Sequence, residues 1–348
     1  MRRNDCLNTI RLLAAINVVW NHSSTHLQLD GIPVAVSRLF VFFHGIPIFF
    51  TLSGFLIWMS IGRSKSFGEY CQKRFWRIYP ELWVAVVVEI VAILIFIRDI
   101  DWFKLGVFAV GQGTIFPFWV PEFLRSYGCG TPNGALWSIF ALVQFYVLAF
   151  PAYRCLHGKG IGRWMIVFAG VVLLSVAFRP SKDLLPINLG KLLSISFVPT
   201  FWMFMLGAWV SEYKDKVLPA VLRFWYVPVV LRAASLVVHV PELPTCFYGF
   251  FHTIIALFVA LSIGYKFPFL NIKVDVSYGI YIYHMTVINV MIMLGFVKVG
   301  FEGFVVAACV TCIIAWLSSM TVGAFSRRMK MCFEIVTKKR KLEIGNET

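Results

Sequence analysis

The sequence predicts an all-α membrane protein whose chain crosses the bilayer many times. Hydrophobic residues make up 59% of the 348 residues and charged residues only 14%, whereas soluble domains carry about 25% charged residues. The mean hydropathy is +0.78. Apolar stretches long enough to cross about 30 Å of hydrocarbon as helices recur along the chain. Together these observations favour a polytopic helical protein over an ordinary soluble domain.

Ten apolar stretches are the predicted transmembrane helices. They are 7–25, 37–60, 78–98, 134–153, 163–178, 195–212, 222–240, 247–264, 276–297 and 301–325. The stretch 103–119 is shorter and is interrupted by glycine and proline, so we expect it to be interfacial or re-entrant. The chain is thereby divided into a transmembrane domain, 1–326, and a basic cytoplasmic tail, 327–348.

The distribution of positive charge predicts the topology. With the amino terminus inside, 22 Lys and Arg residues fall in the inside segments and eight in the outside segments. The positive-inside rule then places both termini in the cytoplasm. This topology and contact with anionic lipid account for the net charge of +15. The charge therefore gives no reason to expect a nucleic-acid partner, and the KKRK of the tail is expected on the inner leaflet.

The first predicted helix carries ionisable side chains that a plain membrane anchor does not need. Arg11 lies near its start, and His22 lies towards its far end. Eleven steps of about 100° end about 20° past three full turns, so the two residues share a face, about 16 Å apart along the axis. His26 continues this face. The structural alternative is that Arg11 reaches the interface and His22 bonds a neighbouring helix.

The sequence KRFWRIYP, residues 73–80, begins the third predicted helix on the cytoplasmic side. Arg74 and Arg77 are one turn apart on one face, and Lys73 is adjacent. Two guanidinium groups in this arrangement can bind phosphate through forked hydrogen bonds. Topology alone also gathers basic residues at such a helix end, so the motif has a structural explanation as well.

Other polar residues also fall within predicted helices. Ser53 and the glycine after it, in FFTLSGFLIW, allow another helix or a slender substrate to approach closely. A lone Gln144 or His284 serves either to join two helices or to line a polar cavity. Glu89 and Arg232 are also expected within the membrane, where they could form an ion pair.

The cysteines predict no disulfide framework and no metal site. Cys309 and Cys312 are one helical turn apart within a predicted span, which is typical of packing, and no His or Cys cluster lies near them. Cys129 and Cys246 fall on the predicted outer side, where they could form one disulfide.

Five motifs in this order resemble the integral-membrane acyltransferase-3 family, which O-acylates cell-surface sugars. Arg11 and His22 are similar to the first-helix motif of that family, and FFTLSGFLIW to its second-helix signature. RFWRIYP resembles its Arg-x-x-Arg motif, LWS…QFY…P its mid-chain motif and SYGIYIYH its late histidine motif. The resemblance extends over nearly the whole chain.

The resemblance implies ten helices around a passage in the inner (plasma) membrane. Acyl-CoA, by default acetyl-CoA, would present its phosphates on the cytoplasmic side, and the acyl group would reach a hydroxyl of a polysaccharide or of its lipid-linked precursor. His22 would be the catalytic residue, with Arg11 as its motif partner. Arg74 and Arg77 would bind the donor, with Ser53 beside its path. The other cavity candidates are His284, Gln144 and Glu89.

One position departs from the family pattern. Many members carry acidic residues just before the glutamine, whereas Leu142 and Val143 stand there in the FALVQFY of this chain. Neither side chain can orient a histidine or take up a proton. If the carboxylate function is present, Glu89 or Glu81 would have to supply it.

A histidine suits two routes of acyl transfer. A neutral imidazole can accept the proton of a sugar hydroxyl as that hydroxyl attacks the thioester, or it can itself carry the acyl group. Two other interpretations stay open. One is a transporter or exporter of polysaccharide or lipid without covalent chemistry, although we find no internal repeat of the kind many transporters have. The other is an inactive relative that acts within a polysaccharide assembly complex.

Overall fold

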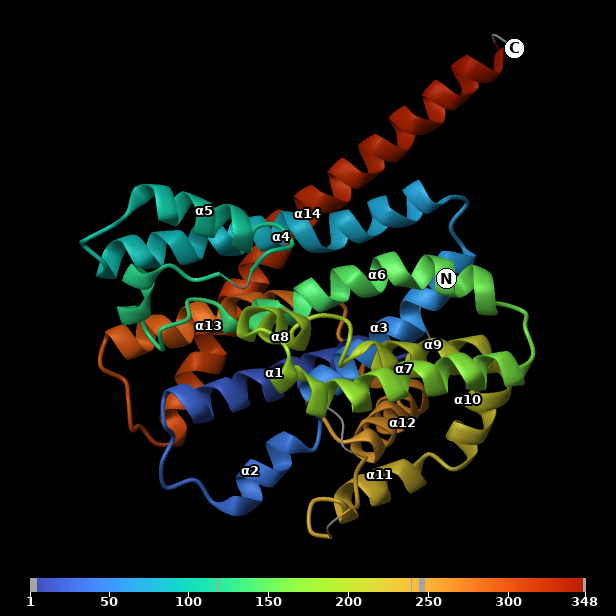
Figure 1. Ribbon diagram of the computed structural model, residues 1–348, viewed down its shortest axis with the longest axis horizontal. Helices are drawn as coiled ribbons and strands as arrows, with labels where there is room; N and C mark the ends of the chain where they lie inside the picture. Colours follow the sequence, from blue (N-terminus) through green and yellow to red (C-terminus); the bar gives the residue numbers. More distant parts are fainter. Residues whose placement is uncertain (1–4, 118, 239, 244–247, 347–348) are drawn as a thin grey trace.

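The computed structural model describes residues 5–117, 119–238, 240–243 and 248–346. All regular elements within these ranges are helices, as predicted, and no strand occurs among them. Most of the long helices lie side by side along one direction (Figure 1). The α-helices are α1 (Leu7–His26), α2 (Val34–Val41), α3 (Gly45–Gly62), α4 (Phe67–Phe96), α5 (Trp102–Gln112), α6 (Trp137–Leu156), α7 (Ile161–Ser181), α8 (Ile187–Ser194), α9 (Phe201–Glu212), α10 (Lys214–Arg223), α11 (Tyr226–Ala234), α12 (Phe250–Lys266), α13 (Ser277–Met293) and α14 (Phe301–Asn346). Short 3-10 helices are η1 (Glu122–Ser126), η2 (Gly134–Leu136), η3 (Lys182–Leu184) and η4 (Pro268–Leu270).

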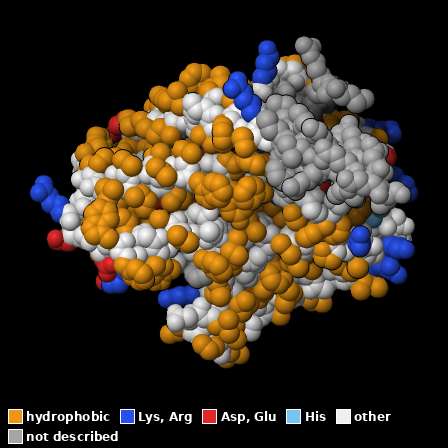
Figure 2. Space-filling view, turned by 90° about the horizontal axis from the view of Figure 1, so that it is seen from above, with side chains coloured by type: hydrophobic (Ala, Val, Ile, Leu, Met, Phe, Trp, Pro, Cys, Tyr) orange, Lys and Arg blue, Asp and Glu red, His pale blue; other side chains and the backbone are white. Residues whose placement is uncertain are grey.

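The lengths and the outer surface of these helices are those of a membrane protein. Among the described residues, five helical segments are long and apolar enough to cross a bilayer, and a sixth is added if the bent pair α10 and α11 counts as one span. Hydrophobic side chains cover much of the face shown in Figure 2. Large apolar side chains such as Ile95, Ile166 and Leu173 are exposed. Contact with lipid accounts for so much exposed apolar surface.

The predicted number of ten spans is not confirmed. The helix α9 has 12 residues, and α12 and α13 have 17 each, fewer than the roughly 20 residues of a typical span. The helix α1 has 20 residues, but its asparagines, arginine and histidines make it less apolar than a typical span. The number of spans and the cytoplasmic location of both termini therefore stay predictions.

The predicted span 37–60 is broken between α2 and α3, and polar side chains bond the backbone at the break. Asn17 of α1 donates from Nδ2 to the Phe40 carbonyl at 2.6 Å and accepts at Oδ1 from the Gly45 N–H at 2.8 Å. Arg232 of α11 donates to two further carbonyl oxygens at the break. Because backbone groups freed inside a membrane need such partners, these side chains stabilise the interruption.

Two other predicted spans are also interrupted. Within 195–212 only α9 is helical, because a proline-containing loop precedes it. Within 222–240 the chain bends by 70° between α10 and α11. The stretch 103–119, expected to be interfacial or re-entrant, contains most of α5. The turn after α5 is held against α4, where Trp83 donates to the Gly113 carbonyl at 2.9 Å.

The last helix continues past the predicted domain boundary at 326/327. No break separates the transmembrane part of α14 from the tail, and the helix reaches Asn346. In Figure 1 its carboxyl-terminal part projects away from the other helices. The predicted tail is thus largely a helical extension of the last span, and its location on the inner leaflet stays a prediction.

The helices α3 and α9 cross at a backbone contact made by two glycines. A Cβ atom on Gly54 would lie 1.9 Å from the Phe204 carbonyl oxygen, and one on Gly207 would lie 1.8 Å from the Thr51 carbonyl oxygen. Only residues without a side chain allow the two backbones to come this close. The glycine after Ser53 therefore serves a helix contact, one of the two uses expected of it.

We expect Gly207→Ala to disrupt the packing of α3 against α9. The added methyl group would overlap backbone atoms, and overpacking a well-packed core costs about 1–3 kcal/mol. The measurement is the thermal unfolding temperature of the purified protein in detergent, which should fall. Gly170→Ala in α7 is the matched control, because a Cβ atom there meets nothing within 4 Å. Equal unfolding temperatures of the two variants would contradict the crossing described here.

Candidate functional site

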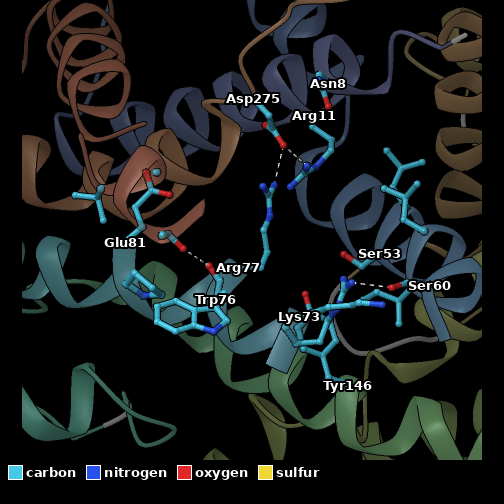
Figure 3. A pocket seen from close by; sticks show the side chains of 18 of the residues that line it. Asn8, Arg11, Ser53, Ser60, Lys73, Trp76, Arg77, Glu81, Tyr146 and Asp275 are labelled. Atoms are coloured by element: carbon cyan, nitrogen blue, oxygen red, sulfur yellow. Dashed lines mark hydrogen bonds and ion pairs between the residues drawn. The ribbon is translucent and has the colours of Figure 1, made fainter. Parts of the chain in front are cut away.

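A cavity of about 720 Å³ opens among α1, α3, α4 and α14 (Figure 3), and most of the charged side chains in its lining are basic. We call it the basic cavity. Six of its lining residues are Lys or Arg and two are acidic. Its lining consists of Asn8, Arg11, Leu52, Ser53, Leu56, Ile57, Ser60, Arg63, Lys73, Arg74, Trp76, Arg77, Pro80, Glu81, Tyr146, Lys273, Asp275, Val322, Gly323 and Ser326. An excess of positive charge in a concave site favours a polyanionic ligand.

Asp275 joins two of the predicted arginines at this cavity. Its carboxylate, in the loop before α13, accepts from Arg11 of α1 and from Arg77 of α4, the latter at 2.7 Å (Figure 3). It also accepts from the Ser277 hydroxyl at 2.6 Å. Burial alone would raise the pKa of the Asp275 carboxyl, but the two guanidinium groups outweigh burial and hold this pKa well below its usual range. One carboxylate thus connects three elements of the fold.

Arg74 is held in place by neutral partners. Its Nη2 donates to the Ser60 hydroxyl of α3 at 2.9 Å. The guanidinium carbon lies 5.8 Å from the ring centres of both Tyr70 and Tyr146, a distance at which aromatic rings attract a cation. Its buried Nε has no hydrogen-bond partner among the described residues. Arg74 is therefore positioned, and its charge is available to an anionic ligand.

A narrower hollow of about 70 Å³ adjoins the basic cavity. We call it the inner hollow. It shares Arg11, Ser53, Arg77 and Tyr146 with the basic cavity. The rest of its lining is mostly apolar or aromatic and consists of Ile46, Phe49, Phe50, Ile78, Ser138, Ile139, Leu142, Tyr278 and Tyr281. The shared residues show that the inner hollow is the continuation of the basic cavity, and Tyr281 is part of its wall.

Three histidines gather beyond the inner hollow. The ring of His284 on α13 lies 5.0 Å from that of His22 on α1, and the rings of His22 and His26 are 5.6 Å apart. The Tyr281 ring lies 5.9 Å from the His284 ring. His284 is fully buried, and the histidines therefore form one cluster with Tyr281 on the side of the hollow.

The hydrogen bond of His284 fixes which ring nitrogen can act as an acceptor. Its Nδ1 lies 3.3 Å from the Ile280 carbonyl oxygen. Because a carbonyl only accepts, Nδ1 carries the hydrogen in this contact and Nε2 presents a lone pair. That Nε2 is buried and has no partner among the described residues. His284 therefore offers a base beside His22.

A family model described as an acyltransferase domain matches residues 4–320. The chain belongs to the acyltransferase-3 family. It is 27% identical over 320 residues to Nodulation protein 10 of Rhizobium leguminosarum bv. viciae, and the match covers 85% of each of the two chains. It is also 27% identical over 346 residues to an O-acetyl transferase of Shigella phage Sf6, and this match covers 94% of this chain and 96% of that protein. No solved structure matches.

The fold of this acyltransferase brings most of the predicted site residues together. Arg11, Ser53, Arg74 and Arg77 all line the basic cavity. His284 contacts His22 across the interface of α1 and α13. The helical spacing predicted one face for Arg11 and His22. Arg11 bonds Asp275 in the loop before α13, and His22 lies against His284 within α13.

Two predicted cavity residues lie elsewhere. Gln144 accepts from the Phe197 N–H at 2.9 Å and lines neither hollow, so it joins α6 to the loop before α9. Glu89 is buried, and its two carboxylate oxygens have no hydrogen-bond partner among the described residues. The suggested ion pair of Glu89 with Arg232 is wrong, because Arg232 bonds the break between α2 and α3.

One of the two carboxylates suggested from the sequence lies where it could replace the missing acidic residues. Glu81 lines the basic cavity and accepts from the Ser318 hydroxyl of α14 at 3.2 Å. Leu142, which stands in the place of an acidic residue, lines the inner hollow. Of the two candidates proposed from the sequence, Glu81 rather than Glu89 therefore lies at the site.

Asp275 is a site residue that the sequence motifs did not identify. It is the acidic residue two positions before SYGIYIYH, in a loop that also carries Lys273. Its partner Arg11 is 264 residues away in the chain. The signal that could have identified Asp275 was its position as a lone acidic residue beside the SYGIYIYH motif, in an otherwise basic segment.

The structure describes Cys129, Cys309 and Cys312 of the predicted cysteine positions. Cys246 lies outside the described residues, so the suggested disulfide with Cys129 is untested. Cys309 and Cys312 are free thiols on α14. Within the described part of the chain, no group of three or more His, Cys, Asp or Glu residues could hold a metal ion.

We expect Asp275→Asn to destabilise the protein by about 1.5–3 kcal/mol at pH 7, because hydrogen bonds to charged groups contribute about that much. The folded-state pKa of Asp275 lies below its unfolded value of about 3.9. Its stabilising contribution is therefore complete above about pH 5 and is lost as the pH falls below about 4. The difference in unfolding temperature between wild type and variant, measured at pH 7 and pH 3, should shrink.

The exposed carboxylate of Asp183 provides the control. Asp183→Asn should leave the unfolding temperature unchanged at both pH values. A difference between wild type and Asp275→Asn that is the same at pH 7 and pH 3 would contradict the role given to the carboxylate.

Proposed function

We propose that this protein transfers an acyl group, acetyl by default, from acyl-CoA to a hydroxyl of a cell-surface polysaccharide or of its lipid-linked precursor. The basic cavity carries the proposal, because six cationic side chains meet there in a concave site. The similarity to a protein named O-acetyl transferase supports O-acylation and the acetyl group. We place the protein in the inner (plasma) membrane with this cavity open to the cytoplasm, where it meets the donor.

The phosphates of the donor are proposed to bind in the basic cavity. Arg74 is positioned by Ser60 and by two tyrosine rings, and its described partners are neutral. Arg77 reaches into the same space from one turn further along α4 (Figure 3). Guanidinium groups form forked, charge-assisted hydrogen bonds with phosphate oxygens. This pair is therefore the preferred anchor for CoA.

The pantetheine arm of the donor is proposed to extend into the inner hollow. Ser53 lies where the two spaces join. The hollow is narrow and mostly apolar beyond that point, which suits a slender chain better than a sugar. His22 lies about 16 Å along α1 from Arg11, so the thioester can be near the histidines while the phosphates stay at the arginines.

At the histidines, His22 is proposed to act as the general base. Its imidazole accepts the proton of the acceptor hydroxyl while the hydroxyl oxygen attacks the thioester carbonyl. The carbon–sulfur bond then breaks, the ester forms, and the proton passes to the thiolate of CoA. Nε2 of His284 can accept a hydrogen bond from the His22 ring. In the second route, His22 first takes the acyl group on a ring nitrogen and then transfers it to the hydroxyl.

Arg74→Ala is expected to raise the Kd for CoA by about 10- to 100-fold, because one charge-assisted hydrogen bond contributes about 1.5–3 kcal/mol. Isothermal titration calorimetry of the purified protein measures this. Arg154→Ala is the control, since Arg154 is exposed at the end of α6, outside the cavity. If both variants bind CoA as tightly as wild type does, the donor site lies elsewhere.

His22→Ala is expected to lower acyl transfer by about 10²- to 10⁴-fold, the usual contribution of a general base. The readout is the O-acyl content of the surface polysaccharide by NMR, with membrane levels of the protein checked in parallel. The Kd for CoA should not change, because the residue lies far from the basic cavity. Wild-type acylation in this variant would overturn the role of His22.

A further inference from the structure

A second cavity of about 720 Å³ lies at the opposite end of α3 from the basic cavity. We call it the arginine cavity. The helix α3 follows His44 at this cavity, lines the inner hollow from Ile46 to Ser53, and ends beside the basic cavity. Its 18 residues rise about 27 Å. The lining consists of Val34, Ser37, Arg38, Val41, His44, Arg179, Arg232, Ser235, Leu236, Glu242, Leu243, Tyr248, Gly249 and His252.

Arg232 is a buried cation whose described partners are all neutral. Only 1% of its surface is exposed. Its guanidinium donates to the carbonyl oxygens of Phe42 and Val41 and to the Ser235 hydroxyl. A guanidinium has five N–H donors, so two remain, and among the described residues no carboxylate pairs with it. A buried charge without a counter-charge is costly, and an anion bound in the cavity would stabilise it.

Two further arginines enter the lining from other elements, Arg38 from α2 and Arg179 from α7. Among the described lining residues the acidic group is Glu242, and it is engaged elsewhere. Its carboxylate accepts from the backbone N–H groups of Phe251 at 2.8 Å and His252 at 2.9 Å, and it contacts the His252 ring. Glu242 thus binds the start of α12, and the lining keeps an excess of positive charge.

The start of α3 lies between the arginine cavity and α1, which carries His22. The His44 ring lies 5.2 Å from the Tyr248 ring, and the next residue, Gly45, donates its N–H to Asn17 of α1 at 2.8 Å, five residues before His22. Tyr281 lines the inner hollow and lies 5.9 Å from the His284 ring. His44 Nδ1 is buried and has no partner among the described residues, so it is open to a polar group in the cavity. The arginine cavity therefore approaches the reacting groups from the side opposite the donor.

We propose that the arginine cavity binds an anionic group, phosphate or carboxylate, of the acyl acceptor. The assignment rests on the proposed acyl transfer and narrows its acceptor to a hydroxyl-bearing molecule that also carries such a group. A neutral sugar would leave the buried charge of Arg232 without a counter-charge. The volume falls within the roughly 300–1,000 Å³ of sites for small ligands.

The test measures anion binding to the full chain in nanodiscs of phosphatidylcholine, with the basic cavity saturated by CoA. Inorganic phosphate and glucuronate are titrated separately by calorimetry. The variant is Arg38→Ala combined with Arg179→Ala, since Arg232 also bonds the backbone and its loss would disturb the fold. Arg98→Ala is the matched control, an exposed arginine after α4 that lines none of the three spaces.

We expect the wild type to bind at least one of the two anions, and the double variant to bind it at least tenfold more weakly. The Kd for CoA should be the same in both proteins, and Arg98→Ala should behave as wild type. Equal anion binding by the double variant, or none by the wild type, would overturn the proposal.

A further experiment distinguishes binding of the acceptor in the arginine cavity from binding of a membrane lipid. If nanodiscs containing phosphatidylglycerol prevent the wild type from binding either anion, the cavity holds a lipid headgroup and the acceptor assignment is wrong. If CoA fails to bind the wild type, the proposed function fails instead. The anion titrations, repeated without CoA on Arg74→Ala protein, then still report on the arginine cavity.

Discussion

The carboxylate of Asp275 is the contact on which the geometry of the site depends. It holds the guanidinium groups of Arg11 and Arg77 at the mouth of the basic cavity and so ties the first helix and the fourth to the start of α13. Without it, two like charges would repel each other across the basic cavity. Apolar surfaces give helices in lipid little reason to prefer one neighbour over another. A buried ionic contact supplies that preference at the basic cavity, where the donor is proposed to bind.

The sequence was most informative where the spacing of residues along one helix predicts which side chains share a face. The separation of Arg11 and His22 places them on one helix face whatever surrounds the helix, and Arg74 and Arg77 share a face for the same reason. The apolar composition likewise fixed the helical class. His284 was found through its motif rather than through any property of its own, and the structure then placed its ring against His22.

The remaining features depend on contacts between distant parts of the chain. Local spacing cannot show that Asp275 meets Arg11 across 264 residues, or that Arg232 bonds a helix break rather than Glu89. The break itself was missed because hydropathy averages over a stretch of residues and does not detect three residues that leave the helix. For the same reason Gln144 was a candidate for the cavity, since a polar residue in an apolar helix looks alike whether it lines a space or joins two elements.

The helix α3 separates the basic cavity from the arginine cavity by its own length. This separation has a consequence for the kinetics of acyl transfer. Under the proposed roles, the donor reaches the histidines from the basic cavity and the acceptor reaches them from the arginine cavity. Both substrates can therefore be bound at the same time. The rate law should then be that of random addition through a ternary complex if His22 is a base. Released CoA should act as a competitive inhibitor toward the acyl donor and leave the apparent affinity for the acceptor nearly untouched.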